Sequence, residues 1–333
     1  SRNMLCSSRP RRFGKSYAAQ MLSAFYSKGA DAGELFAHLR VANPPEETKE
    51  KEKEWYNKYR NNCDVLFWDM AWFISNAQNI EDTILNLQRD IGKELREAFP
   101  DCVTEEVVSL PEILLTISVK TGHKFLIIID EWDALFREAP ENTELQKIYI
   151  QLLRALFKGI QVSRFLCGAY MTGILPIKKL KTQSALNNFE EFTMLDAGRM
   201  APYVGFTEEE VHGLCEQYGC SYEQVKSWYD GYLLEDYQVY NPKAVVSVML
   251  NGKYKSYWSN TGSYEAIVPL INMDFDGLKS AIIEMLSGAS VEVDVTSFQN
   301  DTVSFANRDD VLTYLIHLGY LAYDQDSRHV FIP

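Results

Sequence analysis

The sequence contains no long hydrophobic run and no cysteine pattern typical of a metal site or a disulfide framework. No apolar segment approaches the roughly 20 residues that a membrane-spanning helix needs, and the first residues lack the basic-then-apolar order of a signal peptide. We therefore expect a cytoplasmic protein without a membrane segment. The six cysteines form no C-x-x-C pair and no zinc-ligand spacing, so we expect reduced thiols.

Positive charge is also scarce. The formal net charge is −13, which argues against a chain whose whole surface binds nucleic acid. No Ser/His/Asp or Cys/His order stands out, and no internal repeat is visible. By contrast, 333 residues with 46% hydrophobic content are enough to bury a large core, and we expect two or more domains.

The most informative segment is a candidate phosphate-binding loop, Arg-Pro-Arg-Arg-Phe-Gly-Lys-Ser. It lies between a short strand candidate, Met4–Cys6, and a helix candidate, Tyr17–Tyr26. In such a loop, backbone N–H groups at a helix N-terminus bind phosphate oxygens, a lysine reaches the terminal phosphates and a hydroxyl ligates Mg²⁺. Those roles fall to Lys15 and Ser16. The usual pattern has glycine where this chain has Arg9, so by pattern alone the match is incomplete.

A second segment supplies acidic residues in a matching place. The apolar run Phe125–Asp130 is followed by Glu131 and is typical of a parallel strand buried on both faces. Ligands of open α/β sheets bind at the carboxyl ends of the strands. We therefore expect Asp130 to hold Mg²⁺ and Glu131 to orient and deprotonate the attacking water. A stray lysine in a turn and a strand ending in solvated acids are the bland alternatives, but the two motifs in this order favour nucleotide binding.

With these motifs, the chain resembles the predicted AAA-ATPase-like family of prokaryotic proteins. The resemblance covers nearly the whole chain, and the family's habit explains Arg9 in place of the first glycine. It implies ATP and Mg²⁺ as ligands. Further matching blocks occur in the family's order: Met171–Leu175, Asn187–Asn188, Gly205–Val211, Trp228–Tyr232, Val239–Pro242 and Tyr257–Thr261.

The resemblance also implies a domain that this chain lacks. Family members commonly carry a PD-(D/E)XK nuclease-like domain after the ATPase, and Asp310–Leu321 resembles the last block before it. We therefore expect a truncated protein, with the nuclease-like domain outside this chain and no nuclease activity within it.

The expected site can be given by residue. Glu131, Lys15 and Thr172 are expected to act in catalysis. Thr172 is included because AAA-type ATPases place a polar residue at the end of the strand after the acid pair, although a threonine at a strand end is otherwise unremarkable. Ser16 and Asp130 are expected to bind Mg²⁺. Contacts with ATP are expected from Arg9, Pro10, Arg11, Arg12, Phe13, Gly14, Lys15, Ser16 and Tyr17.

A second basic cluster, formed by Lys178, Lys179 and Lys181, follows the next strand candidate. It is either a cation source near the terminal phosphate or a solvated helix start, and the sequence leaves both interpretations open.

Strands separated by helices predict an α/β, P-loop NTPase (AAA-like) core with a parallel sheet over residues 1–202. The charged stretch Pro44–Tyr59 is expected to be an exposed insertion. The other strand candidates are Asp64–Asp69, Arg164–Thr172 and Phe192–Leu195, and the helix candidates are Ile80–Phe99, Leu110–Val119 and Glu144–Phe157.

Residues 203–262 are expected to form a helical lid. Thr207 and Glu210 have the spacing of a capping box, and Ser221–Tyr229 and Pro242–Leu250 are two further helix candidates. The aromatic residues of Trp228–Tyr232 are expected to pack in a core rather than to stack on bases.

Residues 263–333 are expected to form a winged-helix-like module. Its helix candidates lack the basic face of a recognition helix, so packing is favoured over DNA binding. The expected elements are a helix at Leu278–Leu286, a strand pair of Val291–Val295 with Val303–Phe305, a helix from Asp310, and strands at Leu321–Tyr323 and Val330–Phe331.

The sequence therefore predicts Mg²⁺-dependent ATP hydrolysis that switches or loads a downstream module, by resemblance a nuclease. Two alternatives stay open: a regulatory scaffold that keeps ATP without hydrolysing it, and a nucleic-acid-binding module with a vestigial ATP site.

Overall fold

The computed structural model of the chain describes residues 3–177, 179–180, 183–184, 186–257, 268–272, 275–300 and 305–333. The chain divides into two compact units. The first comprises Ser1–Leu5, Ser16–Thr172 and Ala185–Glu190, and the second comprises Cys6–Lys15, Gly173–Ser184 and Glu191–Pro333.

A five-stranded sheet has the strand order β2-β3-β4-β1-β7. Strands β2, β3 and β4 are parallel, with Asp64 paired to Phe125 and Ile129 to Met171. The predicted α/β core with a parallel sheet is confirmed. The strands are β1 (Met4–Ser8), β2 (Asp64–Asp69), β3 (Phe125–Asp130), β4 (Leu166–Gly173) and β7 (Glu190–Phe192).

The predicted fifth strand, Phe192–Leu195, was placed too late in the chain, because β7 ends at Phe192. The hydroxyl of Thr193 accepts hydrogen bonds from the backbone N–H groups of Leu195 and Asp196, both over 3.1 Å. This side-chain turn replaces the ladder and ends the strand.

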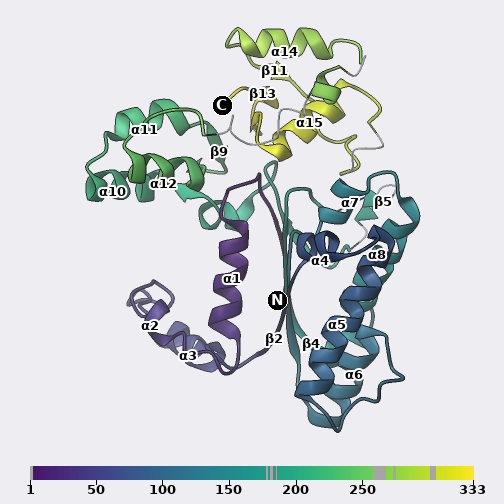
Figure 1. The fold of residues 1–333 in the computed structure, drawn as a ribbon. Helices are drawn as coiled ribbons and strands as arrows, with labels where there is room; N and C mark the ends of the chain where they lie inside the picture. Colours follow the sequence, from purple (N-terminus) through teal and green to yellow (C-terminus); the bar gives the residue numbers. More distant parts are fainter. Residues whose placement is uncertain are drawn as a thin grey trace. The chain divides into compact units, whose positions relative to one another are not determined.

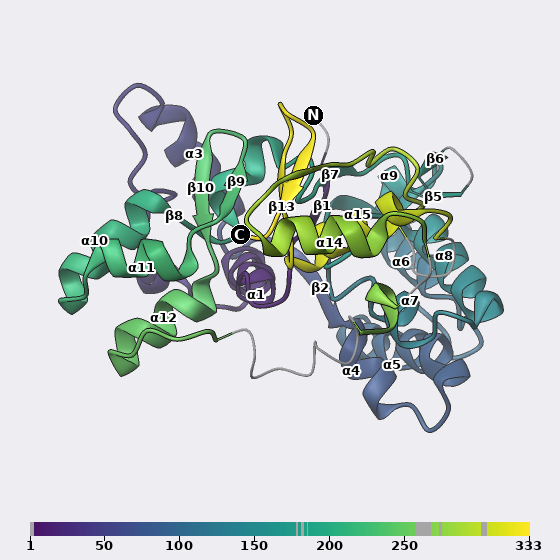
Figure 2. The same cartoon turned by 90° about the horizontal axis from the view of Figure 1, so that it is seen from above.

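Helix α1 (Lys15–Tyr26) packs on one face of the sheet. Its Ala19 lies in a buried cluster with Ile128 of β3 and Tyr170 of β4. Ile127 and Ile129, which alternate with Ile128 along the strand, are fully buried on the other face. Figures 1 and 2 show α1 on one side of the strands and helices α5, α6 and α8 on the other.

The remaining helices of the first unit lie between the strands in sequence. Pro111 in the first turn of α6 and left-handed Gly122 after it start and stop this helix as these residues usually do. These helices are α4 (Met70–Asn76), η1 (Ile80–Asp82), α5 (Thr83–Ala98), α6 (Leu110–Thr121), α7 (Ala134–Glu138), α8 (Thr143–Phe157) and α9 (Val162–Phe165).

The segment Pro44–Tyr59, which was predicted to be an exposed insertion, is partly buried. After the short helix α2 (Gly33–Phe36), helix α3 (Lys49–Tyr59) buries Tyr56 in a cluster with Phe25 of α1. The ring of Trp55 stacks on Phe25 with centroids 5.8 Å apart. The prediction of an exposed segment was based on the charged residues of α3 and did not take account of its aromatic residues, which lie on one face of the helix.

The three helices predicted for the lid are present in the second unit as α10 (Glu208–Tyr218), α11 (Tyr222–Tyr229) and α12 (Pro242–Asn251). Thr207 and Glu210 form the predicted capping box. The expected core packing of the aromatic residues is confirmed only in part: Tyr229 and Tyr232 are buried, and Tyr229 lies in a cluster with Tyr240, whereas Trp228 and Tyr237 are exposed. The prediction missed the sheet β8-β10-β9, whose strands Phe206–Thr207, Tyr237–Tyr240 and Tyr232–Leu234 are too short for a periodic pattern.

The last part of the chain contains α14 (Leu278–Leu286), β11 (Val291–Glu292), α15 (Arg308–Leu318), β12 (Ala322–Asp324) and β13 (His329–Phe331). Val291 of β11 pairs with Val330 of β13. Val303 and Ser304 of the strand predicted to pair with Val291–Val295 lie outside the described residues. A further short hairpin joins β5 (Lys179–Leu180) to β6 (Gln183–Ser184).

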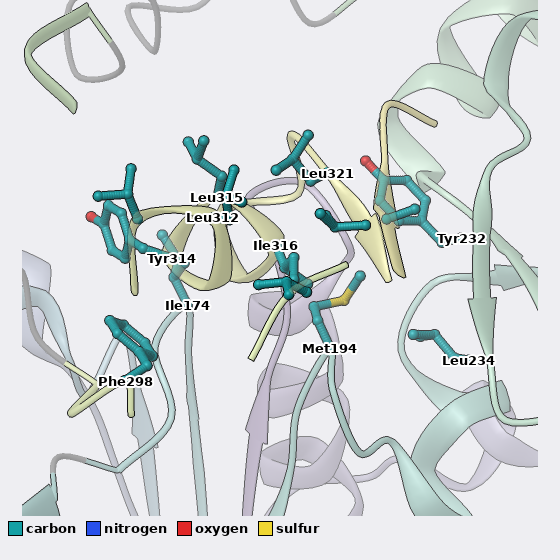
Figure 3. Packing of buried hydrophobic residues seen from close by; sticks show 14 of the residues in the cluster. Ile174, Met194, Tyr232, Leu234, Phe298, Leu312, Tyr314, Leu315, Ile316 and Leu321 are labelled. Carbon is teal, nitrogen blue, oxygen red and sulfur yellow. The ribbon is translucent and has the colours of Figure 1, made fainter. Parts of the chain in front are cut away.

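Helix α15 is almost wholly buried, from Asp310 to His317. Its apolar side chains pack with Ile174, Met194 and Phe298 of the same unit (Figure 3). In the sheet β11-β13-β12, strand β11 precedes this helix in the chain and strands β12 and β13 follow it. A helix buried on all sides has no free face with which to read DNA, so this finding favours the packing interpretation.

Candidate functional site

The phosphate-loop candidate connects β1 to α1 and contains two residues in the left-handed region. Arg12 has φ 71° and Gly14 has φ 86°. Such residues next to a helix N-terminus turn successive backbone N–H groups toward one point and form an anion-binding concavity. A Cβ at Gly14 would meet nothing within 4 Å, so the need for glycine here is conformational rather than steric.

Lys15 is only 4% exposed, and its Nζ donates to the carbonyl oxygen of Pro10 over 2.9 Å. The ammonium therefore lies inside the loop, at the first residue of α1. The helix dipole favours anions at this end, so a buried lysine here suits a bound anion rather than helix stability. Ser16 follows in the first turn and is partly buried, whereas Tyr17 is exposed.

The side chain of Arg9 turns toward other residues of the second unit, to which Arg9 itself belongs. The guanidinium is buried and donates from Nη1 to the carbonyl oxygen of Thr193 over 2.9 Å and from Nη2 to that of Met200 over 3.4 Å. Arginine can replace the usual glycine because its side chain turns away from the inside of the loop. Any contact of Arg9 with ATP would therefore come from its backbone.

Phe13 is a second anchor of the loop. Its ring is buried and meets Tyr232 edge-on, with centroids 5.4 Å apart. A Cβ on Gly205 would lie 3.3 Å from the ring of Phe13, so this glycine leaves room for it. The isolated glycine in the Gly205–Val211 block was the only sequence signal for this packing.

Two hydrogen bonds from side chains to backbone carbonyl oxygens join the loop to other residues of the second unit. Asn241 donates from Nδ2 to the carbonyl oxygen of Arg11 over 3.4 Å, and Arg12 donates from Nη1 to that of Tyr257 over 2.8 Å. Arg11 itself is exposed and Pro10 is buried. No sequence pattern predicts the contact from Asn241, which also caps α12.

The acid pair lies at the end of β3, in the first unit. Asp130 is buried, and its Oδ1 accepts from the backbone N–H of Glu131 over 3.0 Å. Glu131 has φ 49°, an uncommon conformation for a non-glycine residue that is often found at functional sites. The structure thus places both carboxylates at a tight turn directly after the strand.

The turn is joined to Thr172 and Tyr149. The N–H of Trp132 donates to the carbonyl oxygen of Thr172 over 3.0 Å, and the hydroxyl of Tyr149 donates to the carbonyl oxygen of Trp132 over 3.0 Å. The structure therefore brings the backbone of Thr172 next to the acid turn.

One charged residue at this turn was missed. Arg137 donates from Nη2 to Oε2 of Glu131 and from Nε to Oδ2 of Asp133, the latter over 3.1 Å. Burial alone would lower the pKa of Arg137, but Asp133 and Glu131 raise it above its ordinary value. The only sequence signal was the i, i+4 spacing of Asp133 and Arg137.

The predicted Mg²⁺ ligands suit a metal held jointly with phosphates. Among the described residues, no group of three or more His, Cys, Asp or Glu side chains could hold a metal ion. Mg²⁺ in nucleotide sites is usually bound by one or two protein oxygens, phosphates and waters, and Ser16 and Asp130 can supply such oxygens.

Of the second basic cluster, Lys178 and Lys181 lie outside the described residues, and Lys179 begins β5. In the matching blocks, Trp258–Thr261 also lies outside them. None of the helices that the structure describes is both long and apolar enough to cross a membrane.

Comparison with known proteins found a family model, a relative and a solved structure that are similar to this chain. Residues 1–182 match the family model described as "Predicted AAA-ATPase". A relative described as "Uncharacterized protein in vnfD 5'region", from Azotobacter chroococcum mcd 1, is 25% identical over 271 residues, which cover 79% of this chain and 48% of the relative. The chain thus spans about half the length of that relative. The crystal structure of Stu0660 of Streptococcus thermophilus aligns over 81% of this chain and 95% of that chain, with 11% identity and a TM-score of 0.25.

Proposed function

Because the chain belongs to the predicted AAA-ATPase family, we propose that it binds ATP together with Mg²⁺ and hydrolyses it to ADP and phosphate. The observation that carries the proposal is the loop before α1, with left-handed Arg12 and Gly14 leading directly to buried Lys15. Membership of the family supports nucleotide binding, and the loop contains backbone N–H groups and a lysine that can bind phosphate oxygens.

In this proposal the N–H groups of the loop and of the first turn of α1 bind the terminal phosphates. Lys15 exchanges the carbonyl oxygen of Pro10 for a phosphate oxygen. The oxygens of Ser16 and Asp130 hold Mg²⁺, which supplies charge neutralisation when bound.

Glu131 is the proposed general base. It accepts a proton from the attacking water as the new O–P bond forms, and the bond between the terminal phosphorus and the ADP oxygen breaks. We propose that Thr172 supports this step from the end of β4, since its carbonyl oxygen holds the turn that presents Glu131.

We also propose the earlier division of the chain, with an ATPase core over residues 1–202, a lid over 203–262 and a winged-helix-like module over 263–333. The arrangement α14, β11, α15, β12 and β13 with sheet order β11-β13-β12 supports the last of these. We propose that the nucleotide state is passed to a downstream module, for which a nuclease-like domain is the candidate by resemblance.

Substitution of the loop lysine tests the proposed binding. Lys15→Ala should strongly reduce the affinity for Mg²⁺-ATP in calorimetry and leave the thermal melt close to that of the parent. Lys147→Ala is the control, because Lys147 is an exposed lysine on α8. If Lys15→Ala binds ATP as tightly as the parent, the loop is not the nucleotide site.

A second function, a scaffold that binds ATP without hydrolysing it, is favoured by one observation. Glu131 is ion-paired with Arg137 in the structure, and a carboxylate engaged by a guanidinium is less available to a water. Single-turnover phosphate release by the purified chain distinguishes the two functions, since only the ATPase releases phosphate from its bound ATP.

A further inference from the structure

We propose that Arg137 is a positioning residue, which Asp133 fixes in place and which holds the carboxylate of Glu131 in the orientation required for hydrolysis. The inference rests on the proposed ATPase function and adds a residue to it that neither the loop nor the acid motif contains.

Asp133 holds the guanidinium of Arg137 in place. Asp133 is fully buried, and its Oδ2 accepts from Nε of Arg137 over 3.1 Å. The backbone N–H of Arg137 also donates to the carbonyl oxygen of Asp133, over 3.2 Å. The Arg137 side chain is only 10% exposed, so this guanidinium has little freedom to move.

The same guanidinium also contacts Glu131. The planar guanidinium presents Nε to Asp133 and Nη2 to Glu131, so one rigid group fixes two carboxylates relative to each other. The Glu131 side chain is 23% exposed and can meet solvent water. Without Arg137, its rotatable bonds would let the carboxylate sample several orientations.

The backbone at Glu131 is also restrained. Glu131 is in the left-handed conformation, and the next residue, Trp132, makes two backbone hydrogen bonds. Its N–H donates to the carbonyl oxygen of Thr172, and its carbonyl oxygen accepts from the hydroxyl of Tyr149. The main chain and the tip of the side chain are therefore fixed independently. Such double restraint is what a reacting group needs, because a displacement of about 1 Å can reduce a rate by about a hundredfold.

A structural ion pair alone would not need this arrangement. Nε of Arg137 pairs with the fully buried carboxylate of Asp133, whereas the carboxylate of Glu131 is partly exposed to water and does not need a cation in order to be solvated. The contact with Glu131 is therefore better explained by the orientation that it gives to this carboxylate than by stability.

The test measures steady-state hydrolysis and ATP affinity of five proteins: the parent, Arg137→Met, Arg137→Lys, Glu131→Gln and the double variant Glu131→Gln/Arg137→Met. Arg137→Met should lower kcat by roughly ten- to a hundredfold and leave the ATP dissociation constant unchanged. Arg137→Lys, which keeps the charge but loses the planar fork, should lie between Arg137→Met and the parent. In the Glu131→Gln background, Arg137→Met should have no further effect.

Arg137→Met removes the cation that pairs with the buried carboxylate of Asp133, so the double variant Asp133→Asn/Arg137→Met, which removes both charges of this ion pair, serves as a folding control. It should also hydrolyse ATP slowly. Turnover at or above the parent rate in a folded Arg137→Met or Asp133→Asn/Arg137→Met protein would overturn the inference, as would an equal further loss in the Glu131→Gln background. A parent that binds ATP but releases no phosphate would instead overturn the proposed hydrolysis, and the role of Arg137 in it.

Discussion

The backbone N–H of Trp132 donates to the carbonyl oxygen of Thr172 over 3.0 Å. This bond lies beyond the last register pair of β3 and β4, Ile129 with Met171, because Thr172 is one residue after Met171 and Trp132 is three residues after Ile129. It links the two segments again after the acid pair. The carboxylates of Asp130 and Glu131 consequently project from a main chain that is held on both sides, which suits groups that must keep a fixed geometry during a reaction.

Removal of the base should separate binding from chemistry. Glu131→Gln keeps the size of the side chain but cannot accept the proton of the water, so phosphate release should fall by about 10² to 10⁴-fold while ATP binds as well as to the parent. Glu138→Gln, on the exposed end of α7, is the matched control. Hydrolysis by Glu131→Gln at the parent rate would assign the activation of water to another residue.

Loss of the metal ligand should have a different signature. Asp130→Asn should weaken ATP binding in the presence of Mg²⁺ and have little effect when EDTA removes the metal, because the carboxylate acts through the ion. Calorimetric titrations with and without EDTA measure both values. An equal loss of affinity under the two conditions would show that Asp130 does not act through Mg²⁺.

The anchor of the loop can be tested through a glycine far from it in sequence. Gly205 has φ 116°, and a Cβ there would lie 2.4 Å from Cγ1 of Val239, so Gly205→Ala should lower the free energy of unfolding by about 1 to 3 kcal/mol. Gly213→Ala, in the exposed middle of α10 with nothing within 4 Å, should instead raise it by about 0.5 to 1 kcal/mol. Urea unfolding of the two variants measures the contrast, and equal midpoints would contradict the packing described for Gly205.

The chain should not cleave DNA. Its nearest candidate acids outside the proposed site are Glu292 and Asp294, and the Oδ1 of Asp294 already accepts from the hydroxyl and the N–H of Thr296, over 2.7 and 3.0 Å. These hydrogen bonds lower the pKa of Asp294 and stabilise a turn. Incubation with supercoiled and single-stranded DNA in Mg²⁺ or Mn²⁺ measures cleavage directly. Cleavage that survives Lys15→Ala and vanishes in Glu292→Ala or Asp294→Ala would contradict this account.

The sequence predicted best those parts of the fold that depend on long periodic patterns or on local chemistry. The apolar run of β3 identified a buried strand, and the spacing of Thr207 and Glu210 identified the start of α10. Both signals are local, so tertiary structure did not override them. The two-residue strand β8 has no such signal, because its pairing with β10 comes from residues about 30 positions away.

The same distinction applies to the site. Lys15, Ser16, Asp130 and Glu131 belong to contiguous motifs and could be selected from the sequence. The role of Arg137 could not, since its two acceptors are defined by the turn at Glu131. The direction of the Arg9 side chain, away from the inside of the loop, could not be predicted either, because it depends on carbonyl groups almost 200 residues away.

The most direct measurement of the central claim is a crystal structure of the chain with a non-hydrolysable ATP analogue and Mg²⁺. We predict that the terminal phosphates lie within hydrogen-bonding distance of the N–H groups of the loop before α1, that Nζ of Lys15 has left Pro10 for a phosphate oxygen, and that Mg²⁺ is bound by the hydroxyl of Ser16 and reached by Asp130 directly or through water. An analogue bound elsewhere, or a loop that stays empty at saturating analogue while Lys15 keeps its bond to Pro10, would contradict the account.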